Sequence, residues 1–313
     1  MNPFLVPGPE NDPGRPLCPW EPDLTCHADY YVDVDDTSAS YRTFQREMAD
    51  GASLAPKGRL VVVMGQEGCG KTSMINRCAH WLQDELRPRG VEARIIDLTA
   101  LPLENQPVPE RMARVSERFV DQLVLADVFA ADRPPLDIRE RRSEWQNVYY
   151  VASQLLDSKF ALLVLLPPIV LLPATPGLVS EISTYAGLAH KRIVFFAEVT
   201  LPSDDVDIVP AIQHTPPPIR LKVTTLTGDD SVLFGSDRLA RHQDVGNYPK
   251  MDNDTLRLAV PRPLPIRYLQ KVLYGVYELR RMSNDRYSRE YEIKYAEIAD
   301  YVYRDLWTRS LGT

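Results

Sequence analysis

The segment Gly65-Gln-Glu-Gly-Cys-Gly-Lys-Thr72 constrains this chain more than any other stretch of its sequence. It matches the pattern G-x-x-x-x-G-K-[ST] at every fixed position. An apolar run, Leu60–Met64, precedes it, and a stretch with helical spacing follows from Lys71 to about Leu86. A strand, a glycine-rich turn and a helix in this order form a loop whose backbone N–H groups point at phosphate oxygens. We therefore predict a nucleotide-binding phosphate loop at 65–72.

Each residue type in this loop has a physical role in holding a triphosphate. Glycines let the backbone turn toward the ligand, and the helix N-terminus adds the positive end of its dipole. We expect Lys71 to reach the β- and γ-phosphates and Thr72 to bind Mg²⁺, with Ser73 a weaker candidate for the metal. The predicted cofactors are ATP and Mg²⁺. The predicted nucleotide-binding residues are Gly65, Gln66, Glu67, Gly68, Cys69, Gly70, Lys71, Thr72 and Ser73.

Length and composition indicate a globular protein. The 313 residues, 44% hydrophobic and 25% charged, suffice for one α/β core and a smaller appended unit. The net charge of −7 argues against a dedicated nucleic-acid binder or membrane-surface binder. The most apolar run, Phe160–Leu172, is interrupted by two prolines and is shorter than the roughly 20 residues that span a bilayer. We therefore predict that no segment crosses a membrane.

The cysteines and the N-terminus point to a reducing compartment. Cys18 and Cys26 are near enough in sequence to bridge a loop, but neither they nor Cys69 and Cys78 form a CxxC pair or a zinc-ligand spacing. Cys69 lies inside the predicted phosphate loop, where a disulfide would hinder the ligand. The N-terminus has no positive or long apolar segment of the kind found in signal peptides. We predict a cytoplasmic location.

Strands and helices alternate through about residue 226, which predicts a parallel sheet with helical crossovers. The expected fold is a three-layer α/β/α domain with a C-terminal helical lid. Its predicted parts are an extended leader (1–50), a nucleotide-binding domain (51–226) and a lid domain (227–313). Predicted strands are Leu60–Met64, Ala93–Leu98, Phe160–Leu166, Arg192–Val199 and Ile219–Leu226; predicted helices are 41–48, 71–86, 109–129, 139–156, 178–189, 229–241, 264–282 and 288–306, with 1–28 extended and 242–263 irregular.

The third predicted strand lacks the acidic residues that ATP-hydrolysing phosphate-loop proteins usually carry. An aspartate at the tip of a buried strand commonly holds the metal, but this strand ends in Pro167-Pro168. Asp97 and Glu198 lie at the ends of two other predicted strands. In a parallel sheet, the carboxyl ends of all strands lie on the same side as the phosphate loop. We assign Asp97 as a candidate metal ligand and Glu198, the stronger candidate, as the residue that orients the attacking water. For both, an ordinary strand-end carboxylate is the alternative.

The chain resembles the AAA+ and STAND groups of P-loop ATPases, in particular the origin-recognition-like branch. The phosphate loop carries this resemblance most specifically. The segments Asn2-Pro3-Phe4 and Tyr41–Met48 are similar to the leader that covers the adenine in such proteins. Lys222–Asp230, with Phe234 and Arg238-Leu239 beyond it, resembles the junction between the last strand and the lid. The third strand departs from the family pattern and is a degenerate Walker B strand.

The resemblance also implies a role for one arginine of the lid. Pro265-Ile-Arg267-Tyr-Leu269 is similar to the lid segment whose arginine senses the γ-phosphate, so Arg267 is a candidate sensor. An exposed helix arginine without a role is the alternative. No arginine finger can be assigned. Farther along, Tyr287, Tyr291, Tyr295, Ile298 and Val302 recur at helical spacing, which predicts packing against the lid or, less expected, a partner-binding stripe.

The expected function is a nucleotide-dependent conformational switch or ATPase that acts on a protein partner. A first alternative is a scaffold that binds nucleotide without hydrolysing it, which the prolines after the third strand favour. A second is a small-molecule kinase with Arg139–Arg142 in an arginine-bearing lid. Origin-type DNA binding is the weakest option, because nothing in the sequence resembles a winged helix.

Overall fold

The computed structural model describes residues 1–9, 12–49, 57–103, 106–130, 136–142, 144–170, 176–244, 246–260, 262–283 and 287–307. Contacts between residues divide the chain into two compact units. One contains Met1–Ser38, Gln66–Ser73 and Val223–Thr313, and the other contains Ala39–Gly65 and Met74–Lys222. By its contacts the phosphate loop therefore groups with the two ends of the chain. The three-part division drawn from composition stays a prediction.

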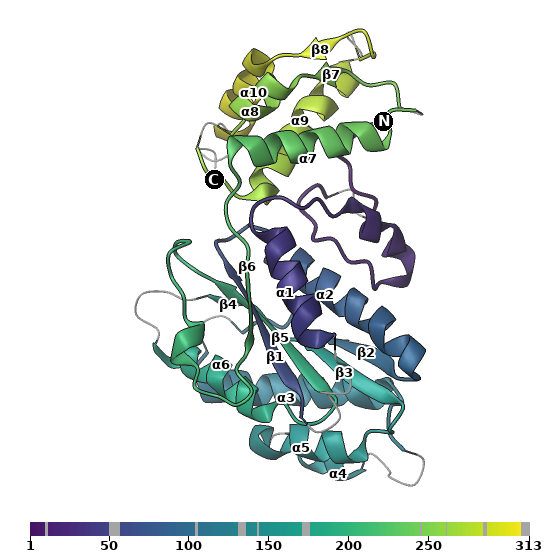
Figure 1. Cartoon of the computed structure of the whole chain (residues 1–313), viewed down its shortest axis with the longest axis vertical. Coiled ribbons are helices and arrows are strands. Elements are labelled where there is room, and N and C mark those ends of the chain that lie inside the picture. Colours follow the sequence, from purple (N-terminus) through teal and green to yellow (C-terminus); the bar gives the residue numbers. More distant parts are fainter. Residues whose placement is uncertain are drawn as a thin grey trace. The chain divides into compact units, whose positions relative to one another are not determined.

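A parallel sheet forms the centre of the second unit (Figure 1). Its strands run in the order β2-β3-β5-β1-β6, and β4 pairs with the end of β5. All six residues of β3 and the first seven of β5 are buried, as long apolar runs in a covered parallel sheet predict. The strands are β1 Arg59–Gly65, β2 Glu92–Asp97, β3 Phe160–Leu165, β4 Ile169–Val170, β5 Ile193–Thr200 and β6 Ile219–Lys222.

Helices flank this sheet, and their sequences explain their ends. In α3, four apolar side chains spaced three or four residues apart are buried, as in a helix with one apolar face: Met112, Val115, Phe119 and Leu123. A proline in the first turn of α3 lacks the N–H that a helix start leaves unpaired. The helices are α1 Thr37–Met48, α2 Lys71–Leu86, α3 Val108–Leu125, α4 Leu136–Glu140, α5 Trp145–Leu155 and α6 Pro176–Leu188, with short 3-10 helices η3 Arg87–Arg89 and η4 Val209–Ala211.

Two neighbouring phenylalanines of β5 show that both faces of the sheet are covered. The ring of Phe195 lies 5.2 Å from Tyr149 of α5 and 5.4 Å from Tyr185 of α6. The ring of Phe196 lies 6.1 Å from Phe44 of α1. Successive side chains of a strand point to opposite faces, so α1 covers one face and α5 and α6 cover the other (Figure 1). The predicted α/β class with helical layers on a central parallel sheet is confirmed.

Two predictions for this unit are wrong, and one short strand was not predicted. The single helix predicted over 139–156 is two helices, because α4 ends at Glu140 and α5 begins at Trp145. The strand predicted over 219–226 ends at Lys222, and Leu226 instead forms an isolated antiparallel bridge with Leu264. The short strand β4 has no counterpart among the predicted strands. Two residues leave no periodic pattern for a prediction to use.

The first unit gathers the N-terminal segment around the C-terminal helices. Phe4 is fully buried, with its ring 5.2 Å from Tyr277 and 6.4 Å from Phe234. Asn2 donates a hydrogen bond of 2.9 Å to the carbonyl oxygen of Tyr274. The elements are η1 Pro22–Tyr30, α7 Gly228–Arg241, β7 Lys250–Met251, α8 Asn253–Leu258, α9 Ile266–Ser283, β8 Glu292–Ile293, α10 Tyr295–Tyr301 and a final turn of π-helix, η5 Val302–Trp307.

Several predictions for this unit also need correction. The sequence predicts an extended segment over 1–28, but η1 is a 3-10 helix with a proline in its first turn. The region 242–263, predicted to be irregular, contains β7 and α8. The side chain of Asp252 caps the start of α8, because it accepts a hydrogen bond of 2.6 Å from the N–H of Thr255. The helix predicted over 288–306 begins only at Tyr295, because β8 pairs with β7 first.

Within the described ranges, no helix combines the length and the apolar character that a membrane crossing needs.

Candidate nucleotide-binding site

The phosphate loop leaves the end of β1 and enters α2 through two glycines in left-handed conformation. Gly68 has φ of +76° and Gly70 has φ of +90°. Residues with a side chain rarely adopt such angles, so the backbone path favours glycine at Gly70, a fixed position of the motif, and at Gly68, a position that the motif leaves variable. α2 then begins at Lys71 and continues for 16 residues. The loop therefore ends at the N-terminus of a long helix, where the helix dipole favours negative charge.

Lys71 is held over this loop. Its side chain is buried, with 3% exposure, and its Nζ donates a hydrogen bond of 2.8 Å to the carbonyl oxygen of Gln66. A neutral carbonyl is a weaker acceptor than a phosphate oxygen. The turned glycines, the ammonium group and the helix N-terminus fit a polyphosphate. These residues would hold ATP if it binds here.

The first turn of α9 lies directly on the loop. The backbone N–H of Arg267 donates a hydrogen bond of 3.0 Å to the carbonyl oxygen of Gly68. A Cβ atom placed on Gly68 would lie 3.2 Å from Cβ of Pro265, which is tighter than most contacts of this kind. A larger residue at position 68 would therefore meet a tight contact with Pro265 in addition to the unfavourable φ. The guanidinium group of Arg267, the candidate sensor, is on an exposed residue.

The N-terminal leader contacts the loop from another direction. The backbone N–H of Leu17 donates to Oγ of Ser73 at 3.1 Å, and the Tyr31 hydroxyl donates to the carbonyl oxygen of Ser73 at 3.0 Å. Ser73 thus anchors the leader, a role that its place beside the motif did not reveal. His27 lies fully buried in η1, where its Nδ1 accepts from the Cys18 N–H at 2.9 Å. Burial lowers the pKa of His27, against the opposing effect of its bond to the Pro7 carbonyl.

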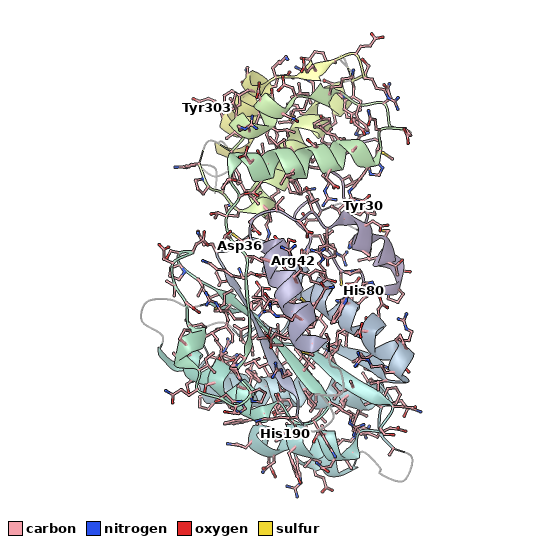
Figure 2. The ribbon with its side chains drawn as sticks, in the orientation of Figure 1. Tyr30, Asp36, Arg42, His80, His190 and Tyr303 are labelled. Carbon is pink, nitrogen blue, oxygen red and sulfur yellow. The ribbon has the colours of Figure 1, made fainter. Side chains whose placement is uncertain are left out.

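A buried arginine near the leader was missed as a candidate. Arg238 of α7 is 4% exposed, and its Nε and Nη1 have no hydrogen-bond partner in the described part of the chain. Its guanidinium carbon lies 4.8 Å from the ring centroid of Tyr30, which Figure 2 labels, and 5.2 Å from that of Phe234. Burial lowers the pKa of Arg238 to about 10, and the nearby Arg241 acts in the same direction. The cation is stabilised mainly by aromatic faces.

Asp35 joins the leader to the start of the lid. Its carboxylate accepts from the N–H groups of Thr37 at 2.6 Å and Thr224 at 3.2 Å, and its own N–H donates to Asp230 at 2.9 Å. Asp230 also accepts a hydrogen bond of 2.8 Å from the N–H of Thr227, and these two residues form a capping box at the start of α7. Burial raises the pKa of Asp35 to about 7, although the bonds from Thr37 and Thr224 favour the charged form.

The two strand-end carboxylates occupy different positions in the sheet. Glu198 is buried on β5 and pairs in register with Val63 of β1, the strand that leads into the loop. Asp97 ends β2 at the edge of the sheet, three strand spacings from β1, which is roughly 14 Å. Its carboxylate accepts from the N–H and the hydroxyl of Thr99, at 2.9 and 2.6 Å. Glu198 is therefore the better placed of the two beside the strand of the loop, and the metal role of Asp97 stays a prediction.

The strand that usually carries the acidic pair is apolar to its end. β3 is followed by buried Leu166 and Pro167, and β4 then continues beside β5 with Ile169 opposite Val199. No group of three or more His, Cys, Asp or Glu side chains suited to a metal occurs in the described residues. The hydroxyl of Thr72, which is partly exposed, and oxygens of the nucleotide itself are ligands that would hold a Mg²⁺ ion beside the loop.

The structure is similar to solved structures of known proteins. A chain of the Aeropyrum pernix ORC2 protein, solved in ADPNP and ADP complexes, superposes with a TM-score of 0.55 at 13% identity, over 88% of this chain and 70% of that one. The chain has the P-loop fold of the AAA+ type. The A. pernix ORC1 protein in complex with DNA gives a TM-score of 0.55 at 16% identity (90% and 68%), and C. elegans PCH-2 gives 0.52 at 12% (92% and 74%).

Sequence comparison adds a second group of P-loop proteins. Thymidylate kinases of Trichormus variabilis and of a Nostoc species are each 32% identical over 163 aligned residues, which cover 43% of this AAA+ chain and 69% of the kinase. No protein-family model matches the sequence. This chain spans about two thirds of the solved proteins that it superposes on, 64% in the case of Drosophila ORC bound to DNA.

Proposed function

We propose that this AAA+ chain is an ATP-dependent conformational switch that acts on a partner protein in the cytoplasm. One observation carries the proposal: the backbone N–H of Arg267, in the first turn of α9, is bonded to the carbonyl oxygen of Gly68 in the phosphate loop. A change in the loop would therefore pass directly to α9, a helix of the same unit. The mechanism resembles that of other switches in which a phosphate-sensing contact sets the position of one element.

Residues of the chain would divide the work as follows. Bound ATP with Mg²⁺ would supply the γ-phosphate that separates the two states. Lys71 would transfer its hydrogen bond from the Gln66 carbonyl to phosphate oxygens, and Thr72 would hold the metal. Arg267 would then respond to the presence or loss of the γ-phosphate. Glu198 is the proposed water-orienting residue, so any hydrolysis depends on a carboxylate of β5 instead of the apolar β3.

Calorimetry with ATP and ADP, each with Mg²⁺, tests this proposal. Lys71→Ala removes a charged hydrogen-bond donor worth about 1.5–3 kcal/mol, so both affinities should fall about 10- to 100-fold. Arg267→Ala should lower the affinity for ATP about tenfold and change the affinity for ADP by less than twofold. Arg281→Ala, an exposed arginine later in α9 that pairs with Glu278, is the matched control and should change neither. If calorimetry detects no heat of binding with ATP and none with ADP, the proposal is rejected.

Two alternatives have support of their own. A scaffold that binds ATP without turnover is favoured by the apolar β3 and by Pro167 and Pro168. A nucleoside monophosphate kinase is favoured by the two thymidylate kinase relatives. Assays of ADP formation and of phosphate release, run with and without thymidine monophosphate, separate the three. No ADP indicates the scaffold, ADP with free phosphate indicates the ATPase switch, and ADP with a phosphorylated acceptor instead of free phosphate indicates the kinase.

A further inference from the structure

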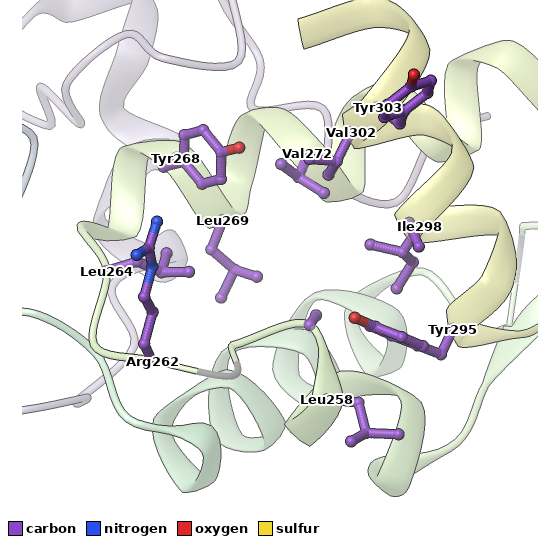
Figure 3. A pocket seen from close by; sticks show the side chains of 12 residues that line it. Leu258, Arg262, Leu264, Tyr268, Leu269, Val272, Tyr295, Ile298, Val302 and Tyr303 are labelled. Carbon is purple, nitrogen blue, oxygen red and sulfur yellow. The ribbon is translucent and has the colours of Figure 1, made fainter. Parts of the chain in front are cut away.

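An apolar cavity of about 380 Å³ opens in the C-terminal helices, apart from the phosphate loop (Figure 3). Leucine, isoleucine, valine and tyrosine side chains line most of it. Tyr268 and Tyr295 are each 41% exposed, Leu258 is 52% exposed and Tyr303 is 73% exposed. Large apolar side chains gathered in this way at the surface mark an interaction site. Tyrosine is also enriched among residues that dominate protein–protein binding energies.

Among the described residues that line this groove, Arg262 carries the one charge, and it is positive. Arg262 is exposed and lines the cavity, as Figure 3 shows. Its side chain makes no ion pair or hydrogen bond with any residue that the structure describes. Nearby Arg257, by contrast, is paired with Asp229 and Asp254. An apolar ligand that carries a carboxylate would complement both features of the groove.

The groove shares a helix turn with the nucleotide site. Arg267 is bonded to Gly68 of the phosphate loop, and the next two residues of α9, Tyr268 and Leu269, line the cavity. Leu264, also in the lining, is bridged to Leu226 by two backbone hydrogen bonds. A shift of this turn moves residues at both sites. Nucleotide and groove occupant would therefore change each other's affinity by the same factor.

We propose that this groove binds an apolar segment of a partner protein that carries an acidic side chain beside its apolar anchors. The inference rests on the proposed switch and names the surface through which the switch is read. A protein segment is favoured over a small molecule because the tyrosines and Leu258 extend the apolar surface beyond the enclosed space. The negative charge of the segment is matched to Arg262.

Selection from a displayed library of random 12-residue peptides on the full chain tests the proposal. Enriched peptides should combine apolar residues with an aspartate or glutamate. Fluorescence anisotropy should show that Leu258→Glu and Arg262→Glu each lower the affinity for the best-binding peptide at least tenfold. Leu233→Glu is the matched control, since Leu233 is 55% exposed on α7 and lies outside the groove, and it should stay within twofold. A peptide with lysine in place of its acidic residue should bind Arg262→Glu better than wild type.

Other outcomes overturn the proposal. Peptides without an acidic preference, or equal binding to Leu258→Glu and Leu233→Glu, would reject it. A dimer in light scattering that Leu258→Glu dissociates would assign the groove to a second copy. Peptide affinities measured with ATP, with ADP and without nucleotide separate this inference from the proposed function. Peptide binding that is specific to the groove but equal in all three conditions keeps the docking site and rejects the switch.

Discussion

Arg267 and Gly68 are joined by a backbone hydrogen bond of 3.0 Å, although 199 positions separate them in the sequence. The bond brings the start of α9 onto the phosphate loop of the same unit. A backbone bond does not depend on the side chain of Arg267, so this contact and the sensing role of the guanidinium group can be tested separately. Gly68 is the residue through which to test the contact.

Gly68→Ala should disturb the loop more than the backbone angle alone predicts. Both Gly68 and Gly90 have positive φ, +76° and +73°, which costs an L-residue about 1–2 kcal/mol. A Cβ atom on Gly90 would meet nothing within 4 Å, whereas one on Gly68 would press on Pro265. Gly90→Ala is thus a matched control. We expect similar losses of stability from the angle, with a further loss and at least tenfold weaker ATP binding only in Gly68→Ala. Equal effects in urea unfolding and calorimetry would contradict this.

Glu198→Gln tests whether hydrolysis uses β5. The change keeps the size of a buried side chain and removes its ability to act as a base. If Glu198 orients the water, ATP turnover should fall about 100-fold while ATP affinity stays within threefold. Glu92→Gln, on the outer strand β2, is the control and should leave turnover unchanged. Turnover that survives Glu198→Gln would end the proposed role.

The ion pair between Arg111 and Glu181 should stabilise the second unit mainly by avoiding an unpaired charge. Nε of Arg111 donates to Glu181 at 2.9 Å, and the carboxylate side chain is 2% exposed. Arg111→Leu leaves this carboxylate buried without its partner, at a cost of about 3–5 kcal/mol. The double variant Arg111→Leu/Glu181→Leu should lose less. Urea unfolding at pH 7.5 measures both, and a double variant at least as unstable as the single one would contradict the explanation.

Asp35 should make stability depend on pH. Burial raises the pKa of Asp35 from 3.8 to about 7. Between these two pH values the folded chain therefore keeps a proton on Asp35 that the unfolded chain has released. The contribution is complete below pH 4 and is lost as the pH rises through 7, by at most about 4 kcal/mol. Asp35→Asn should lack this loss, and asparagine tolerates the positive φ of 49°.

Unfolding free energies of wild type and Asp35→Asn from pH 5 to pH 8 measure the effect. The difference in unfolding free energy between the two proteins should change in favour of the variant from pH 5 to about pH 7 and should level off above pH 7, where Asp35 is charged in both states. His27, His190 and His242, whose pKa values are lowered by burial, titrate in both proteins and cancel in the difference. Parallel curves would show that Asp35 is charged throughout the range.

Local sequence patterns were enough to predict the features of this protein that depend on residues close together in sequence. The motif Gly65–Thr72 marks the phosphate loop because each fixed position serves the turn, the charge or the metal. The three central strands, β3, β5 and β1, are long apolar runs, and Thr227 and Asp230 cap α7 from three residues apart. The alternation of strands with helices predicted the parallel sheet and its class.

Contacts between distant segments could not be read in the same way. Nothing local places β5 beside β1, bonds Arg267 to Gly68 or packs the leader onto Ser73, because each contact depends on residues far apart in sequence. The two-residue strands are too short to show a period, and they form only where a partner strand offers free backbone groups. Chain order thus specified the elements, whereas the site and the groove arose from long-range packing, in which burial and close approach outweigh local preference.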